Sequence, residues 1–305
     1  MSFGNRPITA TSLQGLLSFA ETGKHASFAR AARALELSPS AVAKSVARLE
    51  STLGVRLFHR TTRQVVLTGD GCELFQRCQR VLEEIDGLRS AAEGSRRTPR
   101  GTLRLDVPVT YGKQVIVPVL ARLADAHPDL GFDVRFSDRF ADLIQDGLDA
   151  VIRVGALGDS RLVARKFDEQ RLVVCASPQY LKRKGTPRTL ADIREHDCVG
   201  NRSYSTGRER SWQFRKSGRD VEVLPRSRIV FDDGEATVHA LTAGLGLMQL
   251  PNYYVEQPLR EGRLIEVLSR FRPPPEPISV VYPSKRQVPQ RLRVLIDVLA
   301  TLRSR

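Results

Sequence analysis

Residues 38–71 read SPSAVAKSVARLESTLGVRLFHRTTRQVVLTGDG. Ser38 is a natural N-cap, and Pro39 suits the first position of a helix, where its missing N–H costs nothing. The apolar residues that follow have helical spacing: Val42, Val46, Leu49 and Leu53. Because Gly54 then interrupts the pattern, the stretch predicts one amphipathic helix that ends near residue 53.

The opposite face of this helix carries short or basic side chains. Such a face can enter a major groove and reach phosphates or base edges. The candidate contacts are Ser38, Pro39, Ser40, Ala41, Lys44, Ser45 and Arg48. Segments 55–58 and 64–67 predict two short strands, and the basic loop between them predicts a wing on DNA. Its candidate contacts are Arg60, Thr61, Thr62 and Arg63.

Upstream, two more helices precede the recognition helix. Residues 9–22 form one amphipathic segment that Gly23 can end, and Ser27 can cap a second segment that runs to Leu35. Only the short turn 36–37 separates that segment from Ser38, which predicts a helix-turn-helix. Ser27 and Arg30 join the candidate DNA contacts, although a solvated Arg30 is an equal alternative.

Composition agrees with a polyanionic partner. The net charge is +14, and residues 1–67 hold nine Lys or Arg against three Asp or Glu. Nucleic acid is the favoured partner, while an acidic membrane surface is also compatible.

A length of 305 residues predicts at least two domains. Residues 1–10 lack an apolar signal core, and no apolar run approaches the ~18 residues of a membrane span, so we expect a cytoplasmic protein without membrane contact.

The four cysteines form no C-x-x-C pair and the five histidines are scattered. We therefore expect no metal site and no disulfide framework.

Residues 68–93 predict a long linker helix, followed by a hinge at 94–101. Its apolar positions form an a/d seam, which predicts dimerisation: Leu74, Cys78, Val81, Ile85 and Leu88. The alternative is that this stripe packs on the chain's own body. Dimerisation would give two reading heads for a two-fold operator.

From residue 102 the pattern becomes an alternation of strands and helices, typical of an open α/β sheet. Expected strands include 103–107, 132–136, 149–155, 162–167, 172–176 and 278–282, and a short helix is expected at 141–146. Open α/β sheets bind ligands beyond the carboxyl ends of their strands. The candidate ligand contacts are therefore Val109, Thr110, Tyr111, Arg153, Val154, Gly155, Asn201, Phe231, Asp232, Asp233 and Pro251.

Residues 38–71 resemble the DNA-binding signature of LysR-type transcriptional regulators. GLDAVIRVG (147–155) and AGLGLMQLP (243–251) are similar to landmarks of the co-inducer domain of that family. The resemblance implies an all-α winged helix-turn-helix with a long linker helix, followed by an α/β effector domain of two lobes, as in periplasmic binding proteins. The domains would span 1–67, 68–101 and 102–305, with lobe I at 102–160 and 270–305 and lobe II at 161–269.

The resemblance also implies a function and partners. We expect a sequence-specific transcriptional regulator with no cofactor, modulated by a small organic effector between the lobes, often a carboxylate in this family. Expected partners are a double-stranded DNA operator, further copies of the chain in a dimer of dimers, and RNA polymerase if the protein activates. Whether it activates or represses stays open.

Three other functions fit the sequence less well. Gly244-Leu245-Gly246 is an isolated G-x-G, and the chain has no P-loop and no G-x-S-x-G, so we expect no enzyme. A plain solute-binding protein fits only the C-terminal part. A thiol-based redox sensor of the same family would pair Cys175 with Cys198, but packing is the favoured role of both thiols.

Overall fold

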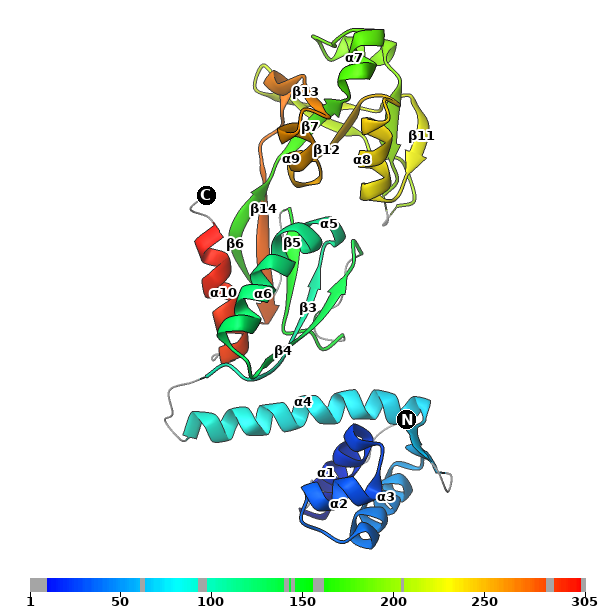
Figure 1. The fold of residues 1–305 in the computed structure, drawn as a ribbon, viewed down its shortest axis with the longest axis vertical. Helices are drawn as coiled ribbons and strands as arrows, with labels where there is room; N and C mark the ends of the chain where they lie inside the picture. The colour runs from blue at the N-terminus through cyan, green and yellow to red at the C-terminus, as the bar shows by residue number, and fades with distance from the viewer. Residues whose placement is uncertain are drawn as a thin grey trace. The chain divides into compact units, whose positions relative to one another are not determined.

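The computed structural model describes residues 10–60, 64–92, 98–139, 143, 146–155, 162–203, 206–283 and 288–302. The chain divides into two compact units, Met1–Arg97 and Thr98–Arg305 (Figure 1). Each unit has hydrophobic core clusters of its own. Among the described residues, no helix combines the length and the hydropathy that a membrane span requires.

The N-terminal unit is a helix-turn-helix with a wing. Its elements are α1 (Ala10–His25), α2 (Phe28–Ala34), α3 (Pro39–Leu53), β1 (Phe58–Arg60), β2 (Val65–Leu67) and α4 (Gly69–Ala92). The predicted caps are confirmed: Ser27 caps α2, Ser38 caps α3, and Gly54 ends α3 at a left-handed φ of 72°. Val42, Val46 and Leu49 of α3 are buried, as their spacing predicts.

Two boundaries in this unit were predicted wrongly. The first helix continues through Gly23 to His25. A Cβ at Gly23 would lie 2.7 Å from the ring of Phe75, so this glycine admits an aromatic ring of α4 instead of ending the helix. The first strand begins at Phe58 rather than at residue 55, because the Leu57 N–H donates to the Glu50 carboxylate.

The expected dimer seam on α4 overlaps the core of the N-terminal unit. Cys78 is only 4% exposed and belongs to the core cluster of its own unit, and Leu74 packs against the same cluster. For Cys78 this burial favours the alternative, packing on the chain's own body, whereas Leu74 stays half-buried. Val81 is 49% exposed and Ile85 is half-buried. The structure does not describe the side chain of Leu88.

Lobe I of the C-terminal unit is built on a five-stranded sheet with the order β4-β3-β5-β14-β6. The strands are β3 (Gly101–Val107), β4 (Leu130–Phe136), β5 (Ala150–Val154), β6 (Leu162–Gln170) and β14 (Glu276–Pro283). β3 runs parallel to β4 and β5, whereas β14 is antiparallel to β5 and β6. The helical segments are α5 (Val109–Tyr111), a π-helical turn (Gly112–Ile116), α6 (Val117–Ala126) and α10 (Gln290–Leu302). They pack on one shared core with the sheet (Figure 1).

Lobe II contains smaller sheets around a separate core. Its strands are β7 (Leu172–Ala176), β8 (Cys198–Asn201), β9 (Trp212–Lys216), β10 (Arg219–Val223), β11 (Ser227–Phe231), β12 (Met248–Pro251) and β13 (Ile265–Val267). β7 lies between β12 and β13, β8 pairs in parallel with β11, and β9 and β10 form a hairpin. The helical segments are α7 (Pro178–Lys184), a short turn (Ala191–Glu195), α8 (Gly234–Thr242), α9 (Asn252–Arg260) and a short turn (Ser269–Phe271).

The predicted lobe boundaries are wrong at both places where the chain passes from one lobe to the other. Residues 162–170, expected in lobe II, form β6 and pair with β14 in the sheet of lobe I. Phe271, expected in lobe I, is buried in the core of lobe II. The reason is that β6 and β14 are two long paired strands, and the chain crosses between lobes only where this pairing ends. The helix expected at 141–146 lies mostly outside the described residues.

Candidate functional site

The recognition face of α3 is open to solvent. Ser38, Pro39, Ser40, Lys44 and Arg48 are exposed, while Ala41 and Ser45 are half-buried. The burial of the opposite stripe fixes which face points outward. Small side chains with two cations between them leave room for a base edge or a phosphate. The face therefore has the form that the sequence predicts.

Two of the serines predicted to contact DNA, Ser38 and Ser27, also cap helices of this unit. The Ser38 hydroxyl accepts a hydrogen bond from the Ala41 N–H at 3.2 Å, and its oxygen lies 3.0 Å from that of Ser40. Ser27 accepts in the same way from the Arg30 N–H at 3.3 Å. These caps orient the helices, so DNA contacts by Ser38 and Ser27 would come in addition to a structural role.

Arg30 is exposed, and its guanidinium donates to the backbone carbonyl of His25 at the end of α1. The side chain is thus tethered beside the turn rather than freely solvated.

The wing is positioned by a residue that sequence reasoning missed. Glu50 of α3 accepts hydrogen bonds from the backbone N–H groups of Leu57, at 2.8 Å, and Phe58, at 3.3 Å. This carboxylate links the recognition helix to the first wing strand. Arg60 lies in β1, where only its backbone is described, and the predicted contacts Thr61, Thr62 and Arg63 lie outside the described residues.

On lobe I, the predicted effector residues follow β3. Val109 begins α5, and its backbone N–H donates to the Asp138 carboxylate at 3.1 Å. Thr110 and Tyr111 are buried. The Tyr111 hydroxyl donates to Asp168 at 2.7 Å, and burial together with this carboxylate raises the pKa of the phenol.

Arg153 is committed to an internal partner. Its guanidinium lies 3.1 Å from the Asp106 carboxylate on the neighbouring strand, and both side chains are at most 10% exposed. Burial raises the pKa of Asp106, whereas the hydrogen bond from Arg153 lowers it. Ile152 belongs to the core beneath the helices, so Arg153 points to the opposite face of the sheet. Its expected role as an anion contact is therefore not supported by the geometry.

The remaining predicted residues lie at strand ends. Val154 ends β5, and Gly155 follows at a left-handed φ of 92°. In lobe II, Asn201 and Phe231 are register partners at the ends of β8 and β11. Asp232 is exposed.

Asp233 and Pro251 precede α8 and α9, two helices of lobe II that contact lobe I through Glu235 and Tyr253. The Asp233 carboxylate caps α8, accepting from the Ala236 N–H at 2.7 Å. Pro251 ends β12 and immediately precedes α9. These positions agree with the ligand-binding edge expected of an open α/β sheet.

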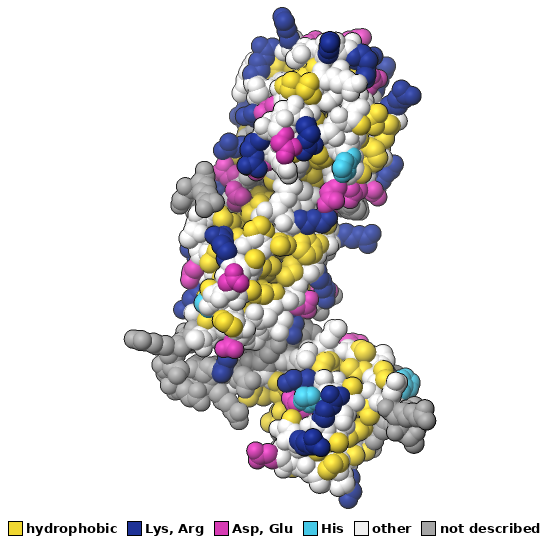
Figure 2. Space-filling model, in the orientation of Figure 1, with side chains coloured by type: hydrophobic (Ala, Val, Ile, Leu, Met, Phe, Trp, Pro, Cys, Tyr) yellow, Lys and Arg dark blue, Asp and Glu magenta, His cyan; other side chains and the backbone are white. Residues whose placement is uncertain are grey.

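Residues that the sequence did not single out connect the lobes. Tyr253 of α9 is buried in the core of lobe I, and its hydroxyl donates to Gln170 at 3.0 Å. The ring of Tyr253 meets that of Tyr111 edge-on, with 5.1 Å between centroids. Lys113, in the turn Gly112–Ile116 that follows α5, forms an ion pair with Glu235 of α8. In the region where Figure 1 places α5 and α8, Figure 2 shows basic and acidic side chains next to each other.

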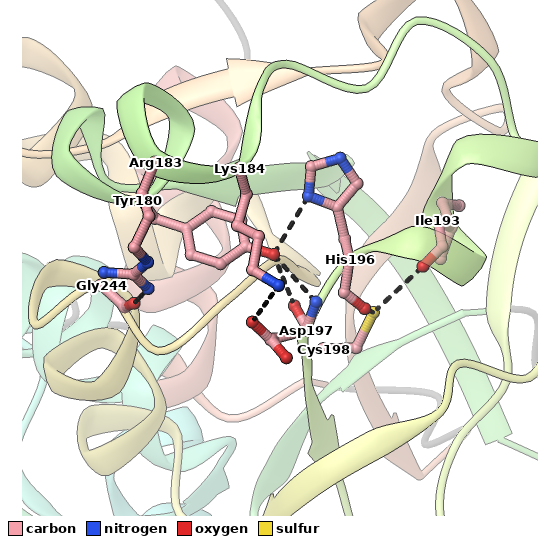
Figure 3. Close-up of polar contacts among 8 residues, drawn as sticks. All are labelled: Tyr180, Arg183, Lys184, Ile193, His196, Asp197, Cys198 and Gly244. Atoms are coloured by element: carbon pink, nitrogen blue, oxygen red, sulfur yellow. Dashed lines mark hydrogen bonds and ion pairs between the residues drawn. The ribbon is translucent and has the colours of Figure 1, made fainter.

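A polar cluster in lobe II surrounds the Tyr180 hydroxyl (Figure 3). This oxygen accepts from the Asp197 N–H at 2.9 Å and lies 3.0 Å from His196 Nδ1. Burial raises the pKa of Tyr180 to about 12 and lowers that of His196. The cluster fixes the segment that leads into β8.

The thiols of lobe II are built into its core. Cys198 donates weakly to the carbonyls of Ile193 and His196 (Figure 3), and Cys175 lies in the central strand β7. Both are at most 1% exposed, and burial raises the pKa of each thiol to about 12. Redox sensing requires an accessible thiolate, so this geometry favours packing. The described residues contain no cluster of three or more potential metal ligands.

Comparison with known proteins agrees with these sites. Residues 13–72 match the family model "Bacterial regulatory helix-turn-helix protein, lysR family", and residues 96–303 match "LysR substrate binding domain". The transcriptional activator AaeR of Escherichia coli K12 is 33% identical over 92% of this chain and 90% of its own length. CrgA, a LysR-type regulator from Neisseria meningitidis, superposes with a TM-score of 0.61 at 30% identity, covering 97% of this chain and 99% of CrgA.

A second structural relative is full-length AphB of Vibrio cholerae, with a TM-score of 0.60, 25% identity and coverage of 95% and 98% of the two chains. The family models together span most of the sequence, and they join a DNA-binding unit to an effector-binding unit. The chain therefore belongs to the LysR family and is a DNA-binding transcriptional regulator whose activity a small-molecule effector modulates.

Proposed function

We propose that the protein acts in the cytoplasm as a dimer of dimers, that α3 enters the major groove of each half of a two-fold operator, and that the wing contacts the adjacent backbone. The observation that carries this proposal is the exposed face of α3, which places Lys44 and Arg48 among small side chains. Repeated reading heads would match a two-fold operator. The protein acts by binding rather than by catalysis.

We further infer that the effector lies between the lobes, beyond the strand ends that precede Thr110, Asn201 and Pro251. A ligand there would contact α5 on one side and α8 on the other, so that it favours one arrangement of the lobes over another. The altered arrangement would change the spacing of the reading heads and, if the protein activates, their contact with RNA polymerase.

Footprinting on the DNA that flanks the protein's own gene, with a salt titration, tests the reading head. A Lys44→Ala/Arg60→Ala variant should lose the footprint, and the salt dependence should weaken by about one unit of slope for each lost phosphate contact. Lys216→Ala, at an exposed cation of the β9–β10 hairpin, is the matched control. Equal loss in the control, or binding that ignores sequence and survives the double substitution, would contradict the proposal.

Assembly is tested by sedimentation. Val81→Glu places a charge on the exposed part of the α4 stripe and should reduce the oligomer, whereas Leu224→Glu, at an exposed apolar residue outside α4, should not. An unchanged oligomer in Val81→Glu would place the interface elsewhere.

A further inference from the structure

A buried segment between α3 and the wing is hydrogen-bonded to two helices at once. Its central residue, Leu57, is fully buried. The Leu57 N–H donates to the Glu50 carboxylate of α3 at 2.8 Å, and the Leu57 carbonyl accepts from the Thr68 N–H at 3.0 Å. Thr68 directly precedes α4. The recognition helix and the linker helix are therefore bonded to the same short stretch of backbone.

The side chain of Thr68 makes a second contact with this stretch. Its hydroxyl donates to the carbonyl of Arg56 at 2.6 Å and accepts from the Gly71 N–H at 2.9 Å. One hydroxyl thus caps the first turn of α4 and also ties that turn to the base of the wing. We call Glu50, Thr68 and residues 56–58 the joint, because these residues connect α3, the wing and α4.

Apolar contacts two turns further along α4 hold the helix at another point. The ring of Phe75 meets that of Phe19 edge-on, with 6.3 Å between centroids, and it lies where Gly23 has no side chain. Cys78 is buried in the same core cluster. Because the contacts at the joint and at Phe75 are separated along α4, together they fix the direction of the helix as well as its position.

The length of α4 turns a small change at the joint into a large displacement. With 24 residues at a rise of about 1.5 Å each, the helix is about 36 Å long. A rotation of roughly 10° at the joint would shift the far end by about 6 Å. This shift is close to the length of two base pairs, at about 3.4 Å each. A joint that prevents the rotation therefore fixes the distance between reading heads that are held together through α4.

We propose that Thr68 is a positioning residue that keeps α4 rigid relative to α3, and that it thereby sets how strictly the protein selects the spacing of its half-sites. The inference rests on the proposed assembly through α4 on a two-fold operator and adds the residue that determines spacing specificity. Without the Thr68 hydroxyl, α4 keeps its apolar contacts but loses its cap and its bond to Arg56. The reading heads then reach half-sites at more than one spacing.

The test measures the dissociation constants of the full chain for its operator and for the same operator with two base pairs inserted between the half-sites. For the wild type, the insertion should weaken binding by about tenfold or more, because the DNA must be deformed to fit. Thr68→Val keeps the shape of the side chain and loses both hydroxyl bonds, so its penalty should fall to about threefold or less. Thr68→Ser keeps the hydroxyl and should keep the wild-type penalty.

Thr22→Val is the matched control, because it removes a hydroxyl bond of 2.7 Å within α1 and leaves the joint intact. It should keep the wild-type penalty. Gly71→Ala is the second variant should Thr68→Val not fold: its Cβ would lie 2.1 Å from the Leu57 oxygen and force α4 away from the joint, so its penalty should also fall. A wild-type penalty in Thr68→Val, or an equal reduction in Thr22→Val, overturns the inference.

A measurement without DNA separates this inference from the proposed function. Spin labels at Ser51→Cys on α3 and Arg77→Cys on α4, both exposed sites, report the distance between the two helices, with Cys72→Ser removing the exposed native thiol. Dilution with unlabelled protein restricts the signal to one chain. The distance distribution should be broader in Thr68→Val than in the wild type, and equal widths overturn the inference. If the wild type binds no operator while the widths differ, the proposed function fails and the rigid joint stands.

Discussion

Gly71→Ala offers a sharp test of how the linker helix is joined to the wing. Gly71 lies in the first turn of α4, and a Cβ there would be 2.1 Å from the carbonyl oxygen of Leu57. An ordinary van der Waals contact needs at least 3.4 Å, so the new Cβ would lie more than an ångström too close to this oxygen. The oxygen belongs to the backbone and cannot move aside as the end of a flexible side chain could. The same carbonyl accepts from the Thr68 N–H at 3.0 Å, so any shift also strains this bond.

Helix propensity alone predicts the opposite sign, since alanine is favoured over glycine by about 1 kcal/mol inside a helix. Overpacking costs about 1–3 kcal/mol, and the weakened hydrogen bond adds about 1 kcal/mol. We therefore expect a net destabilisation of about 2 kcal/mol. Gly69→Ala is the control two residues away, where a Cβ meets nothing within 4 Å. It should be neutral or slightly stabilising.

Calorimetry of the full chain, combined with hydrogen exchange of the β1 and β2 amides, measures both variants. Gly71→Ala should lower the unfolding temperature of the N-terminal unit and increase exchange in the wing, while Gly69→Ala should do neither. If Gly71→Ala proves as stable as Gly69→Ala, the close approach of α4 to Leu57 is not a packing constraint and the reasoning fails.

Three further outcomes are expected. Glu50→Ala removes the acceptor of two backbone N–H groups and should destabilise the N-terminal unit by about 2 kcal/mol in urea unfolding, whereas Glu50→Gln, which keeps an acceptor oxygen, should cost less than half of that. Tyr253→Phe removes the hydroxyl that donates to Gln170 and should cost about 1 kcal/mol in the C-terminal unit without changing operator binding. The pKa values of the Cys175 and Cys198 thiols rise from 9.0 to about 12 on folding. The contribution of these two thiols to the free energy of unfolding is therefore complete below pH 9 and is lost as the pH rises towards 12. Urea midpoints that do not fall above pH 9 would contradict this prediction.

The helix-turn-helix could be predicted because its signals are local. Ser38 caps an N–H three residues away, and Gly54 adopts its left-handed φ directly after the last turn of α3. The end of α1 could not be predicted in this way. Gly23 resembles a helix stop, but its lack of a side chain serves the ring of Phe75, which lies far away in sequence.

The C-terminal unit shows the same division between local and distant causes. β6 was recognised as a strand but placed in the wrong lobe, because its partner β14 begins more than a hundred residues later. The β9–β10 hairpin was missed although its signal is local: Ser217 and Gly218 both have positive φ at the turn between two alternating segments. The Lys113–Glu235 pair has no local signal, because it exists only once the two lobes are built.

The apolar stripe of α4 shows why periodicity alone does not identify the surface that covers a helix face. A stripe reports which face of a helix avoids water, and not which surface covers it. Here Leu74 and Cys78 lie close enough to α1 to enter the core of their own unit, and burial raises the pKa of the Cys78 thiol to about 11. Val81, less than one turn further on, is already half exposed. We therefore expect substitutions at Leu74 or Cys78 to lower stability before they affect assembly, whereas Val81 presents an exposed side chain to a second copy.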